Sequence, residues 1–153
     1  MIEIQAKGTH EGPDWSLQCV EVPHVQPYLT CQAYRLDHGE KSFCYSGDAS
    51  YSKAFVRMAT DCDVMVHMCH RISGTQLHPA ALTVSAAHLD VARIAEEAGA
   101  KTCIFTHINA QMDVPGVPER LLQQIGEVYK GHAIWGNDLM QIGFDPPAAG
   151  GIV

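Results

Sequence analysis

The sequence lacks several features that would place it in familiar classes of protein. No apolar run approaches the roughly 20 residues that a membrane-spanning helix requires, and the first residues carry neither the basic nor the apolar segment of a secretory leader. Basic residues are few, 10 against 17 acidic ones, so the formal net charge of −7 gives little attraction for a phosphate backbone. The sequence therefore predicts a cytoplasmic protein without membrane contact, for which nucleic acid is an unfavourable partner.

Paired cysteine motifs and nucleotide-binding loops are also absent from the sequence. The six cysteines form no CxxC pair and mostly lie in apolar runs, which favours reduced core thiols over a disulfide framework. Neither a glycine-rich phosphate loop nor a serine nucleophile elbow occurs. With 153 residues, 46% of them hydrophobic, the chain is long enough for one core, and residues 1–153 are expected to form a single domain.

Hydrophobic periodicity predicts strands first, and alternating helices and strands afterwards. Strands are expected at residues 2–4, 17–22, 31–36, 42–46, 63–68, 102–108 and 138–144, and helices at residues 50–60, 85–100 and 118–131. Turn-forming residues separate the early strands, which are therefore expected to be antiparallel. The helix at residues 85–100 has the clearest apolar face, and Gly99 is placed to end it. This order of elements predicts an α/β fold with its antiparallel part first.

Polar residues fall at the ends of three successive predicted strands. Asp48, His67 and His107 each follow or end an apolar run. Because α/β folds commonly build their sites at one rim of the sheet, we expect these side chains to converge there. A carboxylate and imidazoles suit zinc or another first-row metal, which can keep one position open for water. Position alone leaves a second interpretation open, in which Asp48 only caps the helix that follows.

Three segments carry a resemblance to a known family. They are "AYRLDHGEKSFCYSGDASYSKAFVRMATDCDVMVHMCH", "ARIAEEAGAKTCIFTHI" and "IWGNDLMQI". In their order and spacing they resemble the second half of a metallo-β-lactamase-fold hydrolase, of the branch that contains ribonuclease Z-like and arylsulfatase-like enzymes. The resemblance extends from about Val20 to Ile142. It implies the C-terminal half of an αββα sandwich, with a mixed sheet flanked by helices.

The resemblance also implies roles for individual residues. Asp48, in "SGD", matches the aspartate that bridges two metal ions in the family, and His107 matches a terminal metal ligand. His67 matches a histidine in a strand-end "HEA"-like motif that helps to position catalytic protons. The implied cofactor is zinc, or another divalent metal such as manganese or iron. The implied reaction is hydrolysis of a small-molecule ester or phosphodiester by metal-activated water.

Several departures from the family pattern bear on activity. The signature "HxHxDH" does not occur in this chain, and the further ligand histidine of the family is not recognised. Met68 stands where the family has an acidic residue, and Ser85 where it often has a histidine; His88, about one helical turn later, is the expected substitute. A single partial domain lacking the "HxHxDH" half is therefore expected. The chain alone is expected to be inactive, with His67 or His88 handling a proton once the site is completed.

Two alternatives remain open at this point. The sequence "HMCH", at residues 67–70, could form a compact metal cluster with His78, whereas His24 and His132 are interpreted as hydrogen-bonded structural histidines. For function, the alternative to half of a hydrolase is a non-catalytic interaction module. In both cases we expect a homo-oligomer or a complex with a complementary half-domain, because an uncovered apolar sheet face seldom remains bare.

Overall fold

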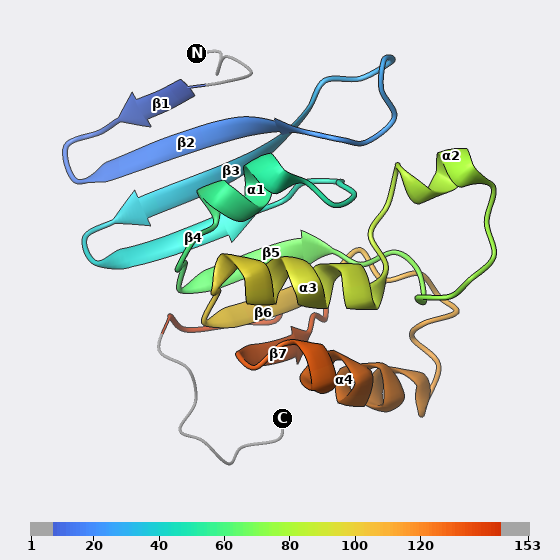
Figure 1. Ribbon diagram of the computed structural model, residues 1–153. Helices are drawn as coiled ribbons and strands as arrows, with labels where there is room; N and C mark the ends of the chain where they lie inside the picture. Colours follow the sequence, from blue (N-terminus) through green and yellow to red (C-terminus); the bar gives the residue numbers. More distant parts are fainter. Residues whose placement is uncertain (1–7, 145–153) are drawn as a thin grey trace.

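Seven strands form one mixed sheet in the computed structural model, which describes residues 8–144 (Figure 1). The strands lie side by side in chain order: β1 (Gly8–Glu11), β2 (Trp15–Val22), β3 (Cys31–His38), β4 (Lys41–Tyr45), β5 (Val64–Met68), β6 (Thr102–Thr106) and β7 (His132–Trp135). Neighbours from β1 to β4 are antiparallel, and neighbours from β4 to β7 are parallel. The predicted α/β class, with its antiparallel part first, is confirmed.

Strand directions bring most of the carboxyl ends to the same side of the sheet. β2 and β4 are both antiparallel to β3, so they run in the same direction. β5, β6 and β7 continue parallel to β4. The carboxyl ends of β2, β4, β5, β6 and β7 consequently lie at one edge, which we call the carboxyl edge.

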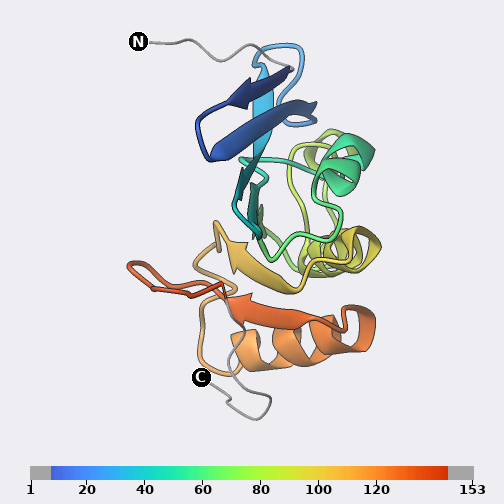
Figure 2. The same ribbon diagram turned by 90° about the vertical axis from the view of Figure 1, so that its left-hand side faces the viewer.

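The helices that pack on the sheet lie on one of its faces. Figure 2 shows α1 (Lys53–Met58), α3 (His88–Ala98) and α4 (Val117–Val128) on the same side of the strands. The short α2 (Pro79–Leu82) interrupts the long connection between β5 and α3. Within residues 8–144, no helix covers the opposite face, which we call the open face.

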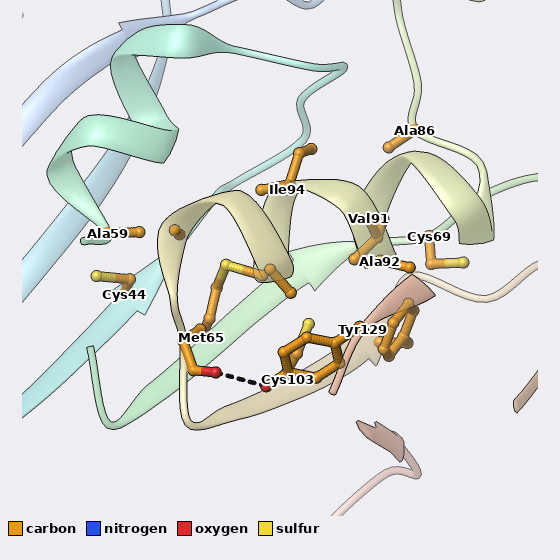
Figure 3. Packing of buried hydrophobic residues seen from close by; sticks show 14 of the residues in the cluster. Cys44, Ala59, Met65, Cys69, Ala86, Val91, Ala92, Ile94, Cys103 and Tyr129 are labelled. Carbon is orange, nitrogen blue, oxygen red and sulfur yellow. Dashed lines mark hydrogen bonds between the residues drawn. The ribbon is translucent and has the colours of Figure 1, made fainter. Parts of the chain in front are cut away.

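Small and sulfur-containing side chains build the core between the helices and the sheet. Figure 3 shows Val91 and Ile94 of α3 above Met65 of β5 and Cys103 of β6, all of them fully buried. α3 ends at Gly99, which takes the left-handed conformation with φ 66°, as its position in the sequence predicts. Four of the five residues of β5 and three of the five of β6 are buried, as expected for parallel strands, which read as near-continuous apolar runs.

Several predicted boundaries need correction. The last strand is His132–Trp135, which pairs in parallel with β6, and the strand predicted at residues 138–144 is wrong. Leu139 there is 98% exposed and has φ 63°, so that apolar run passes over the surface rather than through the sheet. β1 and α2 were not predicted. The strand predicted at residues 2–4 lies outside the described residues.

Two predictions from composition can be compared with the structure. None of the six cysteines, all of which fall within residues 8–144, forms a disulfide, and five of them are buried. The prediction of reduced core thiols is therefore confirmed. Among residues 8–144, none of the helices has the length and apolar character needed to cross a membrane.

Candidate metal centre

A polar side chain follows every strand that ends at the carboxyl edge. These residues are His24 after β2, Asp48 after β4, His70 after β5, His107 after β6 and Asn137 after β7. Each comes within three residues of the end of its strand. The topology therefore gathers residues far apart in sequence at one edge of the sheet, which is where α/β folds commonly place their sites.

The "SGD" turn carries Asp48 from the end of β4 to the carboxyl edge. Gly47 has φ 58°, and a Cβ at this position would lie 2.8 Å from the carbonyl oxygen of Gln32. Glycine is therefore needed both for the left-handed conformation and for the close backbone approach. Ser46 is fully buried, and its Oγ accepts a hydrogen bond from the backbone N–H of Met68 at 3.1 Å. The turn is thus fixed to the end of β5.

Asp48 does not cap the helix that follows it. The N-cap of α1 is Ser52, whose Oγ accepts a hydrogen bond from the backbone N–H of Phe55 at 3.2 Å. The interpretation of Asp48 as a helix cap is therefore wrong. Its side chain is 45% exposed, so the carboxylate is open to solvent or to a ligand.

Asp48 lies between two imidazoles. Its Oδ2 is 3.6 Å from Nε2 of His107 and 3.9 Å from Nε2 of His24. The structure thus brings together the two residues predicted as metal ligands, Asp48 and His107, and adds His24. Two ligands that share a metal at bond lengths of about 2.1 Å lie about 3.4 Å apart at a tetrahedral angle, and further apart at wider angles. Both separations are in that range.

The second ring nitrogen of His24 has a fixed partner. Nδ1 of His24 forms a short hydrogen bond with the carbonyl oxygen of Val84. Because a carbonyl can only accept, Nδ1 carries the proton and Nε2 presents its lone pair on the side of Asp48. Ligating histidines ordinarily donate their other N–H in this way. The prediction that His24 is hydrogen-bonded is correct, but the same bond also prepares the ring for a metal.

Strand parity could have identified His24 from the sequence. β2, which precedes His24, is antiparallel to β3, and β3 is antiparallel to β4, which precedes Asp48. β2 and β4 therefore run in the same direction. Both strands must then end at the same edge, and both are followed by a polar residue within three positions. The sequence interpretation considered only the three later strands and therefore missed His24.

His107 is also paired through its Nδ1. That atom lies 3.0 Å from Nδ1 of His70, and the two rings cross at 83° with centroids 4.7 Å apart. The backbone of His107 has φ 57°, in the left-handed region that few residues other than glycine occupy. Such a conformation persists only where the surrounding structure holds it. His70 was considered only as part of the "HMCH" cluster, so its contact with His107 was missed.

A pocket of about 580 Å³ lies beside these residues. Its walls include His24, Asp48, His70 and His107, together with residues of the connection between β5 and α3 and of the loop after β6. The polar side chains of Thr75, Asn109 and Gln111 share this lining with apolar ones such as Leu77 and Met112. The mixture is typical of small-molecule sites, in which a few polar groups orient a ligand within an apolar wall.

The residues predicted to handle protons, His67 and His88, do not line this pocket. The His67 ring is fully buried, with its Nδ1 donating to the Met68 carbonyl at 2.8 Å. Burial lowers the pKa of His67 to about 4. The catalytic role of His67 thus stays a prediction, with no contact to the pocket in its favour.

His88 joins three segments of the chain. Its Nδ1 accepts a hydrogen bond from the backbone N–H of Ser73 at 3.0 Å, and its Nε2 lies 2.8 Å from Oε1 of Gln124. Burial lowers the pKa of His88, and its hydrogen bond with Gln124 acts in the opposite direction. Both ring nitrogens are thus engaged, and the catalytic role also stays a prediction here. Ser85, which stands at the family's histidine position, does line the pocket.

The "HMCH" residues do not assemble as a separate site. His67 and Cys69 are fully buried, His70 contacts His107, and His78 uses its Nδ1 to cap α2. Within residues 8–144, no group of three or more His, Cys, Asp or Glu side chains stands ready to hold a metal ion. His24, Asp48 and His107 therefore supply suitable donor types, two imidazole nitrogens and a carboxylate oxygen, for an incomplete centre.

Known proteins of similar sequence bear names of hydrolases. The chain is 29% identical over 106 residues to the probable metallo-hydrolase YhfI of Bacillus subtilis. The aligned region covers 67% of this chain and 39% of YhfI. The chain is also 35% identical over 86 residues to ribonuclease Z of Myxococcus xanthus. This aligned region covers 56% of this chain and 27% of that protein. No family model matches the chain.

Solved structures share the fold at lower identity. The metallo-β-lactamase-fold protein YhfI has a TM-score of 0.72 at 22% identity, over 87% of this chain and 51% of that one. The short form of human tRNase Z has a TM-score of 0.66 at 13% identity, over 89% of this chain and 44% of that one. The chain thus spans about half, or less, of the length of these relatives. The chain therefore has the metallo-β-lactamase fold, and its sequence is similar to those of a probable metallo-hydrolase and a ribonuclease Z.

Proposed function

We propose that this chain supplies part of the metal site of a metallo-β-lactamase-fold hydrolase that cleaves an ester or a phosphodiester with water. The supporting observation is the position of the Asp48 carboxylate between Nε2 of His24 and Nε2 of His107. The names of its relatives, a probable metallo-hydrolase and a ribonuclease Z, support the reaction class.

His24, Asp48 and His107 are the proposed ligands of a divalent metal, with zinc as the first candidate. When bound there, the metal supplies hydrolytic chemistry by lowering the pKa of water and polarising the bond to be cleaved. The hydrogen bond from Nδ1 of His24 to Val84 keeps the Nε2 lone pair available. Three protein ligands are the usual minimum for a catalytic zinc, and within residues 8–144 these three do not stand ready as a complete group, so the proposal leaves further ligands to another segment or polypeptide.

The adjoining pocket is the proposed binding site for the substrate. The side-chain amide of Gln111 can donate hydrogen bonds to ester or phosphoryl oxygens, as can the second N–H of the Asn109 amide, whose first donates to the His70 carbonyl. Asn109 is held in place because its Oδ1 accepts from the backbone N–H of Gln111 at 2.9 Å. The apolar side chains of Leu77 and Met112 give the pocket a surface against which an apolar part of the substrate can pack.

RNA belongs among the substrates to be tested. The composition argues against a phosphate backbone as partner, but a ribonuclease Z is among the relatives, and its name states that it acts on RNA. An RNA phosphodiester therefore stands beside small esters and phosphodiesters in the proposal.

The remaining ligands are proposed to come from outside these 153 residues. "HxHxDH" does not occur in the sequence, and no complete metal group stands ready within residues 8–144. We propose that a segment or polypeptide bearing that signature completes the centre, and that the 153-residue chain alone has negligible hydrolase activity.

Metal titration tests this proposal. We expect Zn²⁺ or Co²⁺ to bind the chain, and expect Asp48→Ala, His107→Ala and His24→Ala each to weaken that binding strongly. His38→Ala is the matched control, because its side chain is 65% exposed and lies at the opposite edge of the sheet. Adding a polypeptide with the "HxHxDH" sequence is expected to raise both affinity and hydrolysis of a nitrophenyl phosphodiester. An affinity for Zn²⁺ or Co²⁺ that is unchanged in all three variants contradicts the proposal.

A second candidate function, an interaction module, is supported by the open face. Strand register places five apolar residues on this face, all of them partly exposed: Leu36, Phe43, Tyr45, Val66 and Ile104. Leaving about 300 Å² of such surface in water forfeits about 7 kcal/mol. That is comparable with the net stability of a whole domain. We propose that a complementary half-domain covers this face, or, in its absence, a second copy of the chain.

Sedimentation of the pure chain at low micromolar concentration distinguishes these occupants. A dimer or larger species is expected from the chain alone, and a defined heterocomplex is expected once the complementary polypeptide is added. A sharp monomer that unfolds cooperatively and binds no apolar dye contradicts the proposal that the open face needs a cover.

A further inference from the structure

The contact between His70 and His107 constrains where one proton can lie. Their Nδ1 atoms are 3.0 Å apart, which is hydrogen-bonding distance. One nitrogen must donate and the other accept, so a single proton lies between the two neutral rings. The choice between the two nitrogens also decides which form His107 presents to Asp48.

Two neutral arrangements satisfy the contact. In the first, Nδ1–H of His107 donates to Nδ1 of His70, and Nε2 of His107 keeps its lone pair, 3.6 Å from Oδ2 of Asp48. In the second, Nδ1–H of His70 donates to His107, whose carbonyl oxygen lies 3.2 Å from the same donor. Nε2 of His107 then carries the proton and cannot bind a metal. Only the first arrangement is competent for metal.

We propose that His70 is the positioning residue of the metal centre: without metal the His107 carbonyl favours Nδ1 of His70 as the donor, and when Nε2 of His107 binds a metal, His70 becomes the acceptor of the His107 Nδ1 proton. The proposal rests on the proposed metal site and adds a role outside the ligand set. His24 obtains the same control from the carbonyl of Val84, which can only accept. The corresponding partner of His107 is the imidazole of His70. The tautomer of His107 is therefore set by a side chain, which a substitution can remove.

Two hydrogen bonds hold the backbone of His70 in place beside His107. The backbone N–H of His70 donates to the carbonyl of Ala86 at 3.0 Å, and the His70 carbonyl accepts from the side-chain amide of Asn109. These bonds tie His70 to the segment before α3 and to the loop after β6. His70 is therefore held by groups independent of any metal, as a preformed support requires.

Cobalt affinity of the full chain is the first test. Loss of a partner to a ligating histidine typically costs roughly 10- to 100-fold in metal affinity, and we expect His70→Ala to lower Co²⁺ affinity by that factor. His70→Asn is expected to recover most of the affinity, because Oδ1 of asparagine can accept the same proton. His38→Ala, a histidine removed far from the site, is expected to leave the affinity unchanged.

Ring ¹⁵N NMR of the Zn²⁺-loaded chain gives a readout that a merely structural role would not move. The unaltered chain and His70→Asn are expected to show His107 with a protonated Nδ1 that exchanges slowly with water, and His70→Ala is expected to show fast exchange. Equal Co²⁺ affinity and an unchanged His107 signal in His70→Ala overturn this inference alone. Absence of Asp48-dependent Co²⁺ binding by the unaltered chain overturns the proposed site, and this inference with it.

If His70→Ala does not fold, His70→Asn decides the question. A protected His107 Nδ1–H in that variant supports the inference, and its loss in a folded variant contradicts it.

Discussion

The buried ring of His67 makes the stability of this protein depend on pH. The ring packs edge-on against Phe55, with centroids 5.3 Å apart, and its Nδ1–H donates to the Met68 carbonyl at 2.8 Å. Its Nε2 is buried and has no hydrogen-bond partner within the described part of the chain. Burial therefore lowers the pKa of His67 to about 4, from its ordinary value of 6.5. Protonation would place a charge in a site that offers it no acceptor.

The sign and size of the effect follow from proton linkage. Between about pH 4 and 6.5 the unfolded chain binds a proton at His67 that the folded chain does not, so the free energy of unfolding falls as the pH falls. Lowering the pH from 7.5 to 5 is expected to reduce the free energy of unfolding by about 2 kcal/mol through His67. The full reduction, reached below the pKa of the folded chain, is about 3 kcal/mol. His88, whose pKa burial also lowers, acts in the same direction. A variant is therefore needed to isolate His67.

Urea unfolding at pH 7.5 and pH 5 measures the contribution of His67. His67→Asn keeps a side-chain donor near the Nδ1 position and removes the titrating group. We expect this variant to be less stable at pH 7.5 because it leaves a cavity, yet to lose about 2 kcal/mol less than the unaltered chain between the two pH values. His38→Asn, at the surface, is the control. Identical pH dependence of the unaltered chain and His67→Asn would refute the assignment of the effect to His67.

Three further substitutions test the fold by chemical denaturation. Gly47→Ala is expected to cost about 1 to 2 kcal/mol, because the new Cβ meets the Gln32 carbonyl in a left-handed backbone; an unchanged stability would contradict this. Tyr129→Phe removes the hydrogen bond from Oη to the Ala100 carbonyl, which is 2.8 Å long and is dashed in Figure 3. This variant is expected to lower the free energy of unfolding by about 1 kcal/mol, and an unchanged stability would show that the carbonyl finds another donor. Ile94→Ala, in the fully buried core, is expected to cost about 2 to 5 kcal/mol, and a cost below that range would mean that the core collapses around the cavity.

The parts of the fold that the sequence could predict are those with a strong period. α3 has an apolar stripe and a glycine at its end, and β5 is a short run of apolar residues between polar ones, so both were located. β7 was missed because His132–Trp135 is four residues long, too short for a period to emerge. The apolar run at residues 138–144 has the composition of a strand but no neighbour to pair with in the described structure. Pairing is a tertiary property that local composition does not carry.

The candidate site was predictable only in part for a related reason. Asp48 and His107 follow clear strands, by three residues and by one, and the resemblance to a family pointed to both. His24 and His70 each stand two residues beyond a strand, a spacing no wider than that of Asp48, but no family motif marked them as ligands. Their hydrogen bonds, to Val84 and to His107, join segments separated by 60 and 37 residues. No local pattern encodes contacts of that range.

The open face and the metal centre are consequences of the same topology. β4 to β7 lie in chain order, and parallel crossovers are nearly always right-handed, so α1, α3 and α4 must all fall on one face. The apolar side chains of the other face then require a cover that residues 8–144 do not provide as a helix. A pocket of about 890 Å³ on that face is lined by Phe43 and Val66, and also by His107. A polypeptide that fills it therefore contacts a proposed metal ligand, so covering the open face and completing the metal centre are expected to be a single binding event.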